Sequence, residues 1–353
     1  MRITYSGTDR DDVMSATSAI RESLYGLGGD DVFYFYGPSG VDPEYDVSDR
    51  FFGGNGADLL QNITLGFDGI GGLGQLAQLS FDGGRGYDTL AVTVAADLSV
   101  YGEKAAEMDL GEIAPLLRSV EHRDYRINLG AVNDALRELT ITGSALDETV
   151  TLSQTASLSG AGEITVRLGG GADEFNFAAS IFVETALLVD TGRGADLVRM
   201  NGSATSYADE FTAVIRTRAG ADTIVLEGMY SEKLNAGAGD DRIFVLTGSF
   251  AEAPDVIRTG TGKDRVYLEL DSYSSVAKIT DFSARWDRIV FDADETRDTG
   301  VTFSRAIWTA ATEDVLYMNN AAGKLYYGDT VLVDFGGETT LSDKNFITDS
   351  WDL

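Results

Sequence analysis

One aspartate recurs along this chain of 353 residues in a fixed local setting. Glycine stands two residues before it and apolar residues stand two and four residues after it, as in AGAGDDRIF at 236–244. The aspartates in this setting are Asp31, Asp58, Asp88, Asp173, Asp196, Asp222, Asp241 and Asp264, with weaker copies at Asp12, Asp147 and Asp287. The glycines are Gly29, Gly56, Gly86, Gly171, Gly194, Gly220, Gly239 and Gly262. Carboxylates and the carbonyls of glycine-rich turns are ligands for a hard divalent cation.

The residues around each aspartate predict the element that positions it. Apolar side chains two and four residues after the aspartate, such as Ile243 and Val245, lie on one face of a strand. A further apolar residue stands seven before it, as at Leu234. The unit is therefore strand, glycine-rich turn, strand, and from Asp147 to Asp287 it advances by about 23 residues per step.

Such a unit cannot bury its own apolar face, so its copies must stack. We therefore predict an all-β fold, a parallel β-roll or β-helix solenoid. The alternative, a series of unrelated hairpin turns, does not explain the apolar columns. Stacking predicts that Ile215 lies over Val189 and Val198 over Phe175.

Stacked coils lie about 4.8 Å apart, which brings the repeat aspartates into one column. Carboxylates at that spacing repel one another, and a divalent cation between coils removes the conflict. Calcium takes six to eight oxygens, whereas magnesium resists losing its waters. The turns are thus predicted to hold Ca²⁺, about six to nine ions along one edge, with the opposite edge formed by loops without metal such as 247–253.

These segments resemble the nonapeptide G-G-x-G-x-D-x-U-x of the RTX (hemolysin-type) calcium-binding family. The resemblance covers about Gly7 to Phe291 and implies that the repeat aspartates are the side-chain ligands. It departs from the family because the motif comes once per 19 to 30 residues and not every nine. The resemblance further implies type I secretion and an extracellular place at the surface of a Gram-negative bacterium.

Composition agrees with bound cations and excludes other classes. Lys and Arg total 27 against 57 Asp and Glu, a formal charge of −30, which argues against nucleic acid and against anionic membranes. The alternative is an acidic protein whose negative charge serves only its solubility, but its acids would then be scattered along the sequence. The chain has no Cys, and its single histidine, His122, is expected to be structural. No apolar run is long enough for a membrane span, and the start lacks a signal-peptide core.

The spacing of the motif divides the chain into four parts. Residues 1–95 and 141–291 are predicted to form two rolls, 96–140 an insertion or junction with a short helix at 131–138, and 292–353 a C-terminal antiparallel β cap. The last part also resembles the secretion segment of type I substrates. Turns are expected at Asn319–Asn320 and Gly336–Gly337.

Three functions remain open on sequence grounds. The first is a structural component of a surface layer or extracellular matrix that folds and self-associates on binding calcium. The second is an adhesin that binds a cell-surface glycan through aromatics, for which the candidates are Tyr207, Tyr230, Phe250 and Tyr273. The third is a polysaccharide lyase or hydrolase, with Arg199, Arg216 and Arg218 beside Asp190 and Glu210 as candidates. No catalytic motif favours the third, so no enzyme activity is predicted.

Overall fold

The computed structural model describes most of the chain, in segments. The described residues are 2–16, 21–35, 49–67, 80–98, 105–111, 117–132, 137–154, 162–178, 186–202, 212–228, 231–246, 255–269, 277–292, 302–303, 315–328 and 330–349. Nearly all of them are strands or turns, and none of them forms an α-helix. No helix in these segments is long and apolar enough to span a membrane. The chain divides into two compact units, Met1–Ala178 and Ala179–Leu353, which are described separately.

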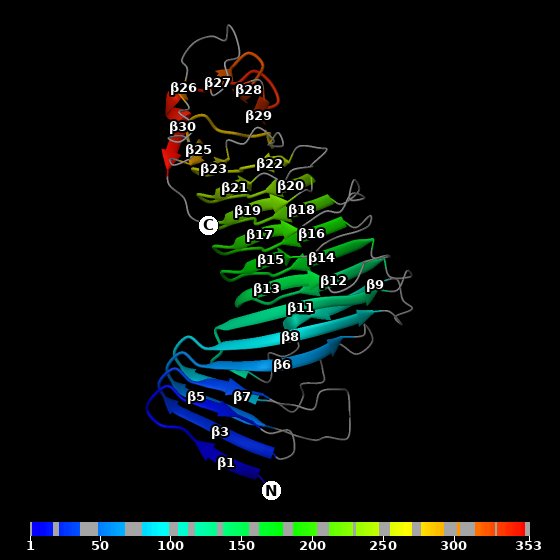
Figure 1. The fold of residues 1–353 in the computed structure, drawn as a ribbon, viewed down its shortest axis with the longest axis vertical. Helices are drawn as coiled ribbons and strands as arrows, with labels where there is room; N and C mark the ends of the chain where they lie inside the picture. The colour runs from blue at the N-terminus through cyan, green and yellow to red at the C-terminus, as the bar shows by residue number, and fades with distance from the viewer. Residues whose placement is uncertain are drawn as a thin grey trace. The chain divides into compact units, whose positions relative to one another are not determined.

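The first unit is built from parallel sheets (Figure 1). One sheet runs β1 (Arg2–Ser6), β3 (Arg21–Gly28), β5 (Arg50–Asn55), β7 (Ser80–Arg85), β10 (Leu117–Arg118). A second runs β2 (Val13–Ser15), β4 (Val32–Tyr34), β6 (Leu59–Phe67), β8 (Thr89–Leu98), β11 (His122–Val132), β13 (Asp147–Gln154), β15 (Glu174–Ala178). A third runs β9 (Ala105–Asp109), β12 (Glu138–Thr142), β14 (Glu163–Arg167).

The second unit repeats this arrangement. Its turn-following strands pair in the order β17 (Leu197–Gly202), β19 (Thr223–Gly228), β21 (Arg242–Leu246), β23 (Arg265–Leu268), β25 (Arg288–Asp292), β30 (Phe346–Asp349). Its turn-preceding strands pair in the order β16 (Ala186–Asp190), β18 (Thr212–Arg216), β20 (Ser231–Asn235), β22 (Val256–Arg258), β24 (Ala277–Ile279). Each repeat therefore contributes one strand to each of two parallel sheets, and the Gly-Asp turn joins them.

The C-terminal segment ends this pattern. Next to β24 lie β29 (Thr330–Asp334), β28 (Lys324–Tyr327), β27 (Val315–Asn319) and β26 (Thr302–Phe303). Strands β27, β28 and β29 are antiparallel, as expected, and the turn after Asn319 joins the first two. Gly336 and Gly337 do not join two strands directly, because a 3₁₀ turn η3 (Asp343–Asn345) follows them before β30.

The apolar columns lie where the sequence predicts them. The side chains two residues after each aspartate and seven before it are almost fully buried, from Phe33 and Leu24 to Val266 and Ile257. Val189 pairs in register with Ile215. Asn62 breaks the column four residues after the aspartate, and the structure explains it: a bulge with positive φ at Asn62 brings Ile63 opposite Val92 instead. The predicted all-β, parallel architecture is thus confirmed.

Residues 96–140 also carry strands. Strand β11 continues through Val132 and β12 begins at Glu138, so the described ends of the segment 131–138 are strand and not helix. The strands β9, β10, β11 and β12 all pair in parallel with strands of neighbouring repeats. A repeat without the motif is therefore present between Asp88 and Glu148.

Candidate metal centre

The repeat aspartates form a buried ladder at the turn edge of each unit. Apart from Asp147, the repeat aspartates from Asp31 to Asp287 are between 0% and 2% exposed. The backbone N–H of a ladder acid donates to a carboxylate oxygen of the ladder acid one coil later, and for Asp88 that acceptor is Glu121 Oε2 at 3.0 Å. The N···O distances are 2.8 Å for Asp12 to Asp31, 2.9 Å for Asp31 to Asp58, 2.8 Å for Asp58 to Asp88, 2.9 Å for Asp196 to Asp222, 2.9 Å for Asp222 to Asp241, 3.0 Å for Asp241 to Asp264 and 3.2 Å for Asp264 to Asp287.

The second carboxylate oxygen, Oδ2, makes no such hydrogen bond in several of these coils. Among the described residues, the buried Oδ2 atoms of Asp31, Asp58, Asp88, Asp241 and Asp264 have no hydrogen-bond partner. A Cβ on Gly26, five residues before Asp31, would overlap Asp31 Oδ2 and lie 2.6 Å from the carbonyl oxygen of Gly53 in the next coil. Both oxygens therefore face the same point between two coils. A buried carboxylate oxygen without a donor needs a proton or a cation.

The glycines two residues before the aspartates bring the coils into contact. All eight have a φ between 99° and 157°, which side-chain-bearing residues rarely adopt. At Gly239 a Cβ would overlap the carbonyl oxygen of Gly220 in the preceding coil, and at Gly56 it would overlap that of Gly29. These carbonyls point along the stacking direction into the gap between coils. The turn therefore supplies oxygens from its backbone as well as from its aspartate.

Burial changes the ionisation of the ladder. Desolvation, opposed by a backbone hydrogen bond, raises the pKa of Asp58 and of Asp241 to about 6. The same cause raises the pKa of Asp222 and of Asp264 to about 7, and neighbouring ladder aspartates add to the rise. The charged forms are thus costly in the absence of a compensating positive charge.

A second, outer column of acids lies beside the ladder, one residue earlier, in those turns that carry an acid at this position. Asp11 accepts from the backbone N–H of Asp30 at 2.9 Å, and Asp30 accepts from that of Ala57 at 2.8 Å. Asp240 accepts from the N–H of Lys263 at 2.9 Å. These side chains are exposed, unlike the ladder. The two acids of segments such as AGAGDD therefore differ in role. The first accepts a backbone hydrogen bond from the next turn at the surface, and the second is buried in the ladder.

Asp147 belongs to this outer column, so the sequence alignment is off by one residue at this coil. Asp147 is partly exposed and accepts from the N–H of Ala172 at 2.7 Å. The ladder position is held by Glu148, which is 0% exposed and whose N–H donates to Asp173 Oδ1 at 3.0 Å. Leu146 stands where other coils have glycine. Sequence reasoning missed Glu148 because it assumed an aspartate with a preceding glycine.

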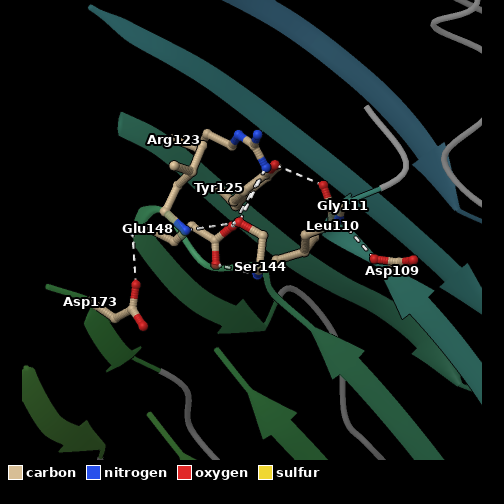
Figure 2. A network of polar contacts seen from close by, with 9 residues as sticks. Asp109, Leu110, Gly111, Arg123, Tyr125, Ser144, Glu148 and Asp173 are labelled. Carbon is tan, nitrogen blue, oxygen red and sulfur yellow. Dashed lines mark hydrogen bonds and ion pairs between the residues drawn. The ribbon is translucent and has the colours of Figure 1, made fainter. Parts of the chain in front are cut away.

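An arginine lies inside this coil (Figure 2). Arg123 is 4% exposed, and its Nη1 lies 3.7 Å from Glu148 Oε1 and 3.4 Å from Ser144 Oγ. Ser144 holds both carboxylate oxygens of Glu148, through its hydroxyl at 2.6 Å and its N–H at 2.8 Å. Burial raises the pKa of Glu148 despite the guanidinium. At this coil the protein itself supplies the positive charge that the ladder needs.

Two further acid pairs lie near the other ends of the strands. The N–H of Glu22 donates to Asp49 at 2.8 Å, and that of Glu232 donates to Asp255 at 3.0 Å. All four side chains are 6% exposed or less. The proximity of Asp255 and burial hold the pKa of Glu232 well above its ordinary value, with burial the larger cause. The sequence gives no sign of these pairs, because each acid stands alone in its segment.

The oxygens between coils fit a hard divalent cation. In the described residues no three acidic or histidine side chains gather at one point, so an ion there would take two ladder carboxylates and turn carbonyls. Each gap offers Oδ2 of one coil, Oδ1 of the next and glycine carbonyls, so each ladder carboxylate is shared between two gaps. Asp31, Asp58, Asp88, Asp222, Asp241, Asp264 and Asp287 would hold such ions. Asp12, Asp173 and Asp196 continue the same columns at their ends.

The enzyme candidates are only partly brought together. Arg218 forms an ion pair with Asp190, and Asp190 pairs in register with Arg216, whereas Arg199 lies on β17 in the other sheet. Glu210, the loop 247–253 and the aromatics Tyr207, Tyr230, Phe250 and Tyr273 lie outside the described residues. His122 lies 3.3 Å from Thr149 Oγ1 and stacks near Tyr87, whose hydroxyl reaches Asp147 at 3.5 Å. No model of a known protein family matches this sequence, and no curated protein is similar to it.

Proposed function

We propose that this chain is a calcium-binding β-roll that folds when Ca²⁺ enters the gaps between its coils. The observation that carries this proposal is the set of buried Oδ2 atoms without partners at Asp31, Asp58, Asp88, Asp241 and Asp264. Buried oxygens of this kind are expensive unless they are protonated or bound to a cation. The net charge of −30 favours the cation.

Calcium would supply positive charge and six to eight coordination positions. The chain's own residues align the coils and bring their oxygens to the gap. The ladder carboxylates fix the register of the coils through their hydrogen bonds to backbone N–H groups. The glycines bring the turns close enough for their carbonyls to face the gap. Arg123 supplies the positive charge in the coil of Glu148, and the gap at this coil therefore needs no metal. The expected load is about six to nine ions per chain.

Metal binding and folding are coupled in such an arrangement, because the site exists only when coils are stacked. The test is circular dichroism of the full chain in excess chelator and at increasing Ca²⁺, with elemental analysis after dialysis. We expect a β spectrum to develop at about millimolar Ca²⁺, with several ions bound. A full β spectrum in chelator, with no bound metal and no thermal shift on adding Ca²⁺, would overturn the proposal.

The biological setting follows from this proposal and has its own test. A chain that is unfolded at cytosolic calcium and ordered outside suits export by a type I secretion machinery and a structural place in a surface layer or extracellular matrix. Electron microscopy of the protein with and without Ca²⁺ tests the structural reading. Ordered lattices or filaments only with Ca²⁺ support it, and monomers in both conditions contradict assembly while leaving the calcium proposal standing.

A further inference from the structure

Three arginines form a column on the outer face of the second unit. In β21, β23 and β25 the residues after the ladder aspartates are Arg242, Arg265 and Arg288, and they pair directly in register. The next residues, Ile243, Val266 and Ile289, are fully buried and face the core. The arginines therefore point away from the core, one above another at the strand spacing of about 4.8 Å.

This column is not explained by its surroundings. Like charges directly opposite each other destabilise a sheet, and a chain of charge −30 has acids in excess to pair with them. Yet in the described part of the chain no carboxylate forms an ion pair with these three side chains. Arg242 lies over the rings of Phe244 and Tyr267, at 5.8 and 5.5 Å, and Arg288 donates to the carbonyl oxygen of Asp287 at 2.6 Å.

A hollow lies in the adjoining turns. Its volume is about 440 Å³, and it is lined among others by Asp240, Thr261, Lys263, Ser283 and Trp286. Lys263, in the turn, and Arg265, the first residue of β23, are both exposed and stand on either side of the buried Asp264. Trp286 likewise stands two residues before Arg288. The hollow therefore lies at the turn end of the arginine column, in the last coils of the roll.

Trp286 gives this surface a flat apolar face. Its side chain is 46% exposed, which is unusual for so large an apolar group. The guanidinium of Arg285 lies 4.5 Å from the centre of its ring. The hollow that Trp286 lines is also lined by Thr261, Ser283, Asp240 and Lys263, residues whose side chains carry donors and acceptors.

We infer that this surface binds an acidic polysaccharide, a chain of sugar rings that carry carboxylates. Trp286 would stack against the apolar face of one sugar ring, and the polar groups of the hollow would bind its hydroxyls. The arginine column would pair with carboxylates further along the chain, because guanidinium binds carboxylate through two parallel hydrogen bonds. Nucleic acid is disfavoured by the net charge, and a neutral glycan would leave the column without a role. The inference does not depend on calcium.

The test is isothermal titration calorimetry with hexagalacturonate, an uncharged hexasaccharide such as cellohexaose and a short duplex DNA. The full chain is used at a Ca²⁺ concentration where its circular dichroism no longer changes. Arg265→Gln removes the centre of the column and Trp286→Ala removes the ring. Arg216→Gln, an exposed arginine on β18 in the other sheet, is the matched control. Thermal melting of each variant checks that it is folded.

We expect hexagalacturonate to bind at least about tenfold more tightly than cellohexaose, and each of the two surface variants to lose about tenfold in affinity, while Arg216→Gln loses none. Equal loss in Arg265→Gln and Arg216→Gln would overturn the inference, since binding would then follow overall charge or bridging calcium. Equal binding of cellohexaose, tighter binding of DNA, or no binding of hexagalacturonate would overturn it as well.

Discussion

Arg123 Nη1 lies 3.7 Å from Glu148 Oε1 inside the roll, in a coil of the first unit whose ladder acid is a glutamate. The pairing of β11 explains how an arginine reaches this column. Arg123 is in register with Leu90 of β8 on one side and with Glu148 of β13 on the other. Leu90 stands two residues after its ladder aspartate, so the column moves by two residues as it crosses β11.

Removing this buried guanidinium should unfold the first unit more easily. Arg123→Leu leaves Glu148 buried without its positive partner, which costs about 3–5 kcal/mol. The double variant Arg123→Leu/Glu148→Leu should recover a large part of that loss. Chemical denaturation at saturating Ca²⁺ measures both. Arg126→Leu, whose partner Asp124 is paired at the surface, is the control and should change stability by less than about 1 kcal/mol. A loss for Arg126→Leu as large as that for Arg123→Leu would contradict the assignment.

Neighbouring aspartates of one turn should differ in their effect on calcium. Asp241→Asn keeps a hydrogen-bond acceptor but removes a ladder charge, so we expect the Ca²⁺ midpoint of folding to rise roughly tenfold. Asp240→Asn changes the exposed outer column and should leave the midpoint nearly unchanged. Calcium titration followed by circular dichroism makes the comparison. Equal midpoints for the two variants would show that the buried ladder does not bind the metal.

The close contact between turns predicts a sharp effect of one added methyl group. Gly239→Ala forces a side chain into a φ of 147° and onto the carbonyl oxygen of Gly220, at a cost of at least about 1–3 kcal/mol. Gly66→Ala in β6 is the matched control, because a Cβ there meets nothing within 4 Å. Thermal melting at fixed Ca²⁺ should separate them. A Gly239→Ala protein as stable as Gly66→Ala would mean that the turns lie further apart.

Acid should stabilise the metal-free protein. Burial raises the pKa of Asp58 and Asp241 to about 6 and that of Asp222 and Asp264 to about 7, above the ordinary value of 3.8. The folded state therefore binds more protons than the unfolded state between these values. The contribution is complete below about pH 4 and is lost as pH rises through 6 to 7.

In excess chelator the β signal in circular dichroism should accordingly fall as pH is raised from 5 to 8. With Ca²⁺ bound the charged carboxylates are favoured, so this fall should disappear or reverse. The variant Asp222→Asn/Asp264→Asn should show a weaker pH dependence in chelator. A metal-free β signal that rises with pH would contradict the assigned burial of these groups.

The spacing of the apolar residues alone predicts much of the fold, because a strand with one buried face must place every second side chain in the core. The columns of Phe33 and Leu24 and the pairing of Val189 with Ile215 are of this kind. What could not be predicted depends on pairing between coils. Asn62 gave no local sign of a bulge, and Glu148 and Arg123 enter the ladder only through the shift of register along β11.

The roles of the acidic residues also depend on pairing between coils and could not be predicted from the local sequence. The motif selects Asp241 and assigns no role to Asp240, and only the fold makes Asp240 an outer cap and Asp241 a buried ladder residue. Asp49 and Asp255 lie far along the chain from Glu22 and Glu232, so their pairing has no local signal. Local chemistry predicts which oxygens a turn can offer, and stacking decides which of them become buried.

The direction of the ladder bonds gives each roll a polarity. In every described rung the N–H belongs to the earlier coil and the carboxylate to the later one, as from Asp58 to Asp88. A coil without an earlier neighbour therefore exposes its ladder carboxylate, whereas one without a later neighbour exposes its ladder amide. The last described rung ends on Asp287, whose Oδ2 is held by the N–H of Ser283 in its own turn. The two faces of a coil thus offer different groups, acceptors on one and donors on the other, and a further coil continues the ladder only in the same orientation.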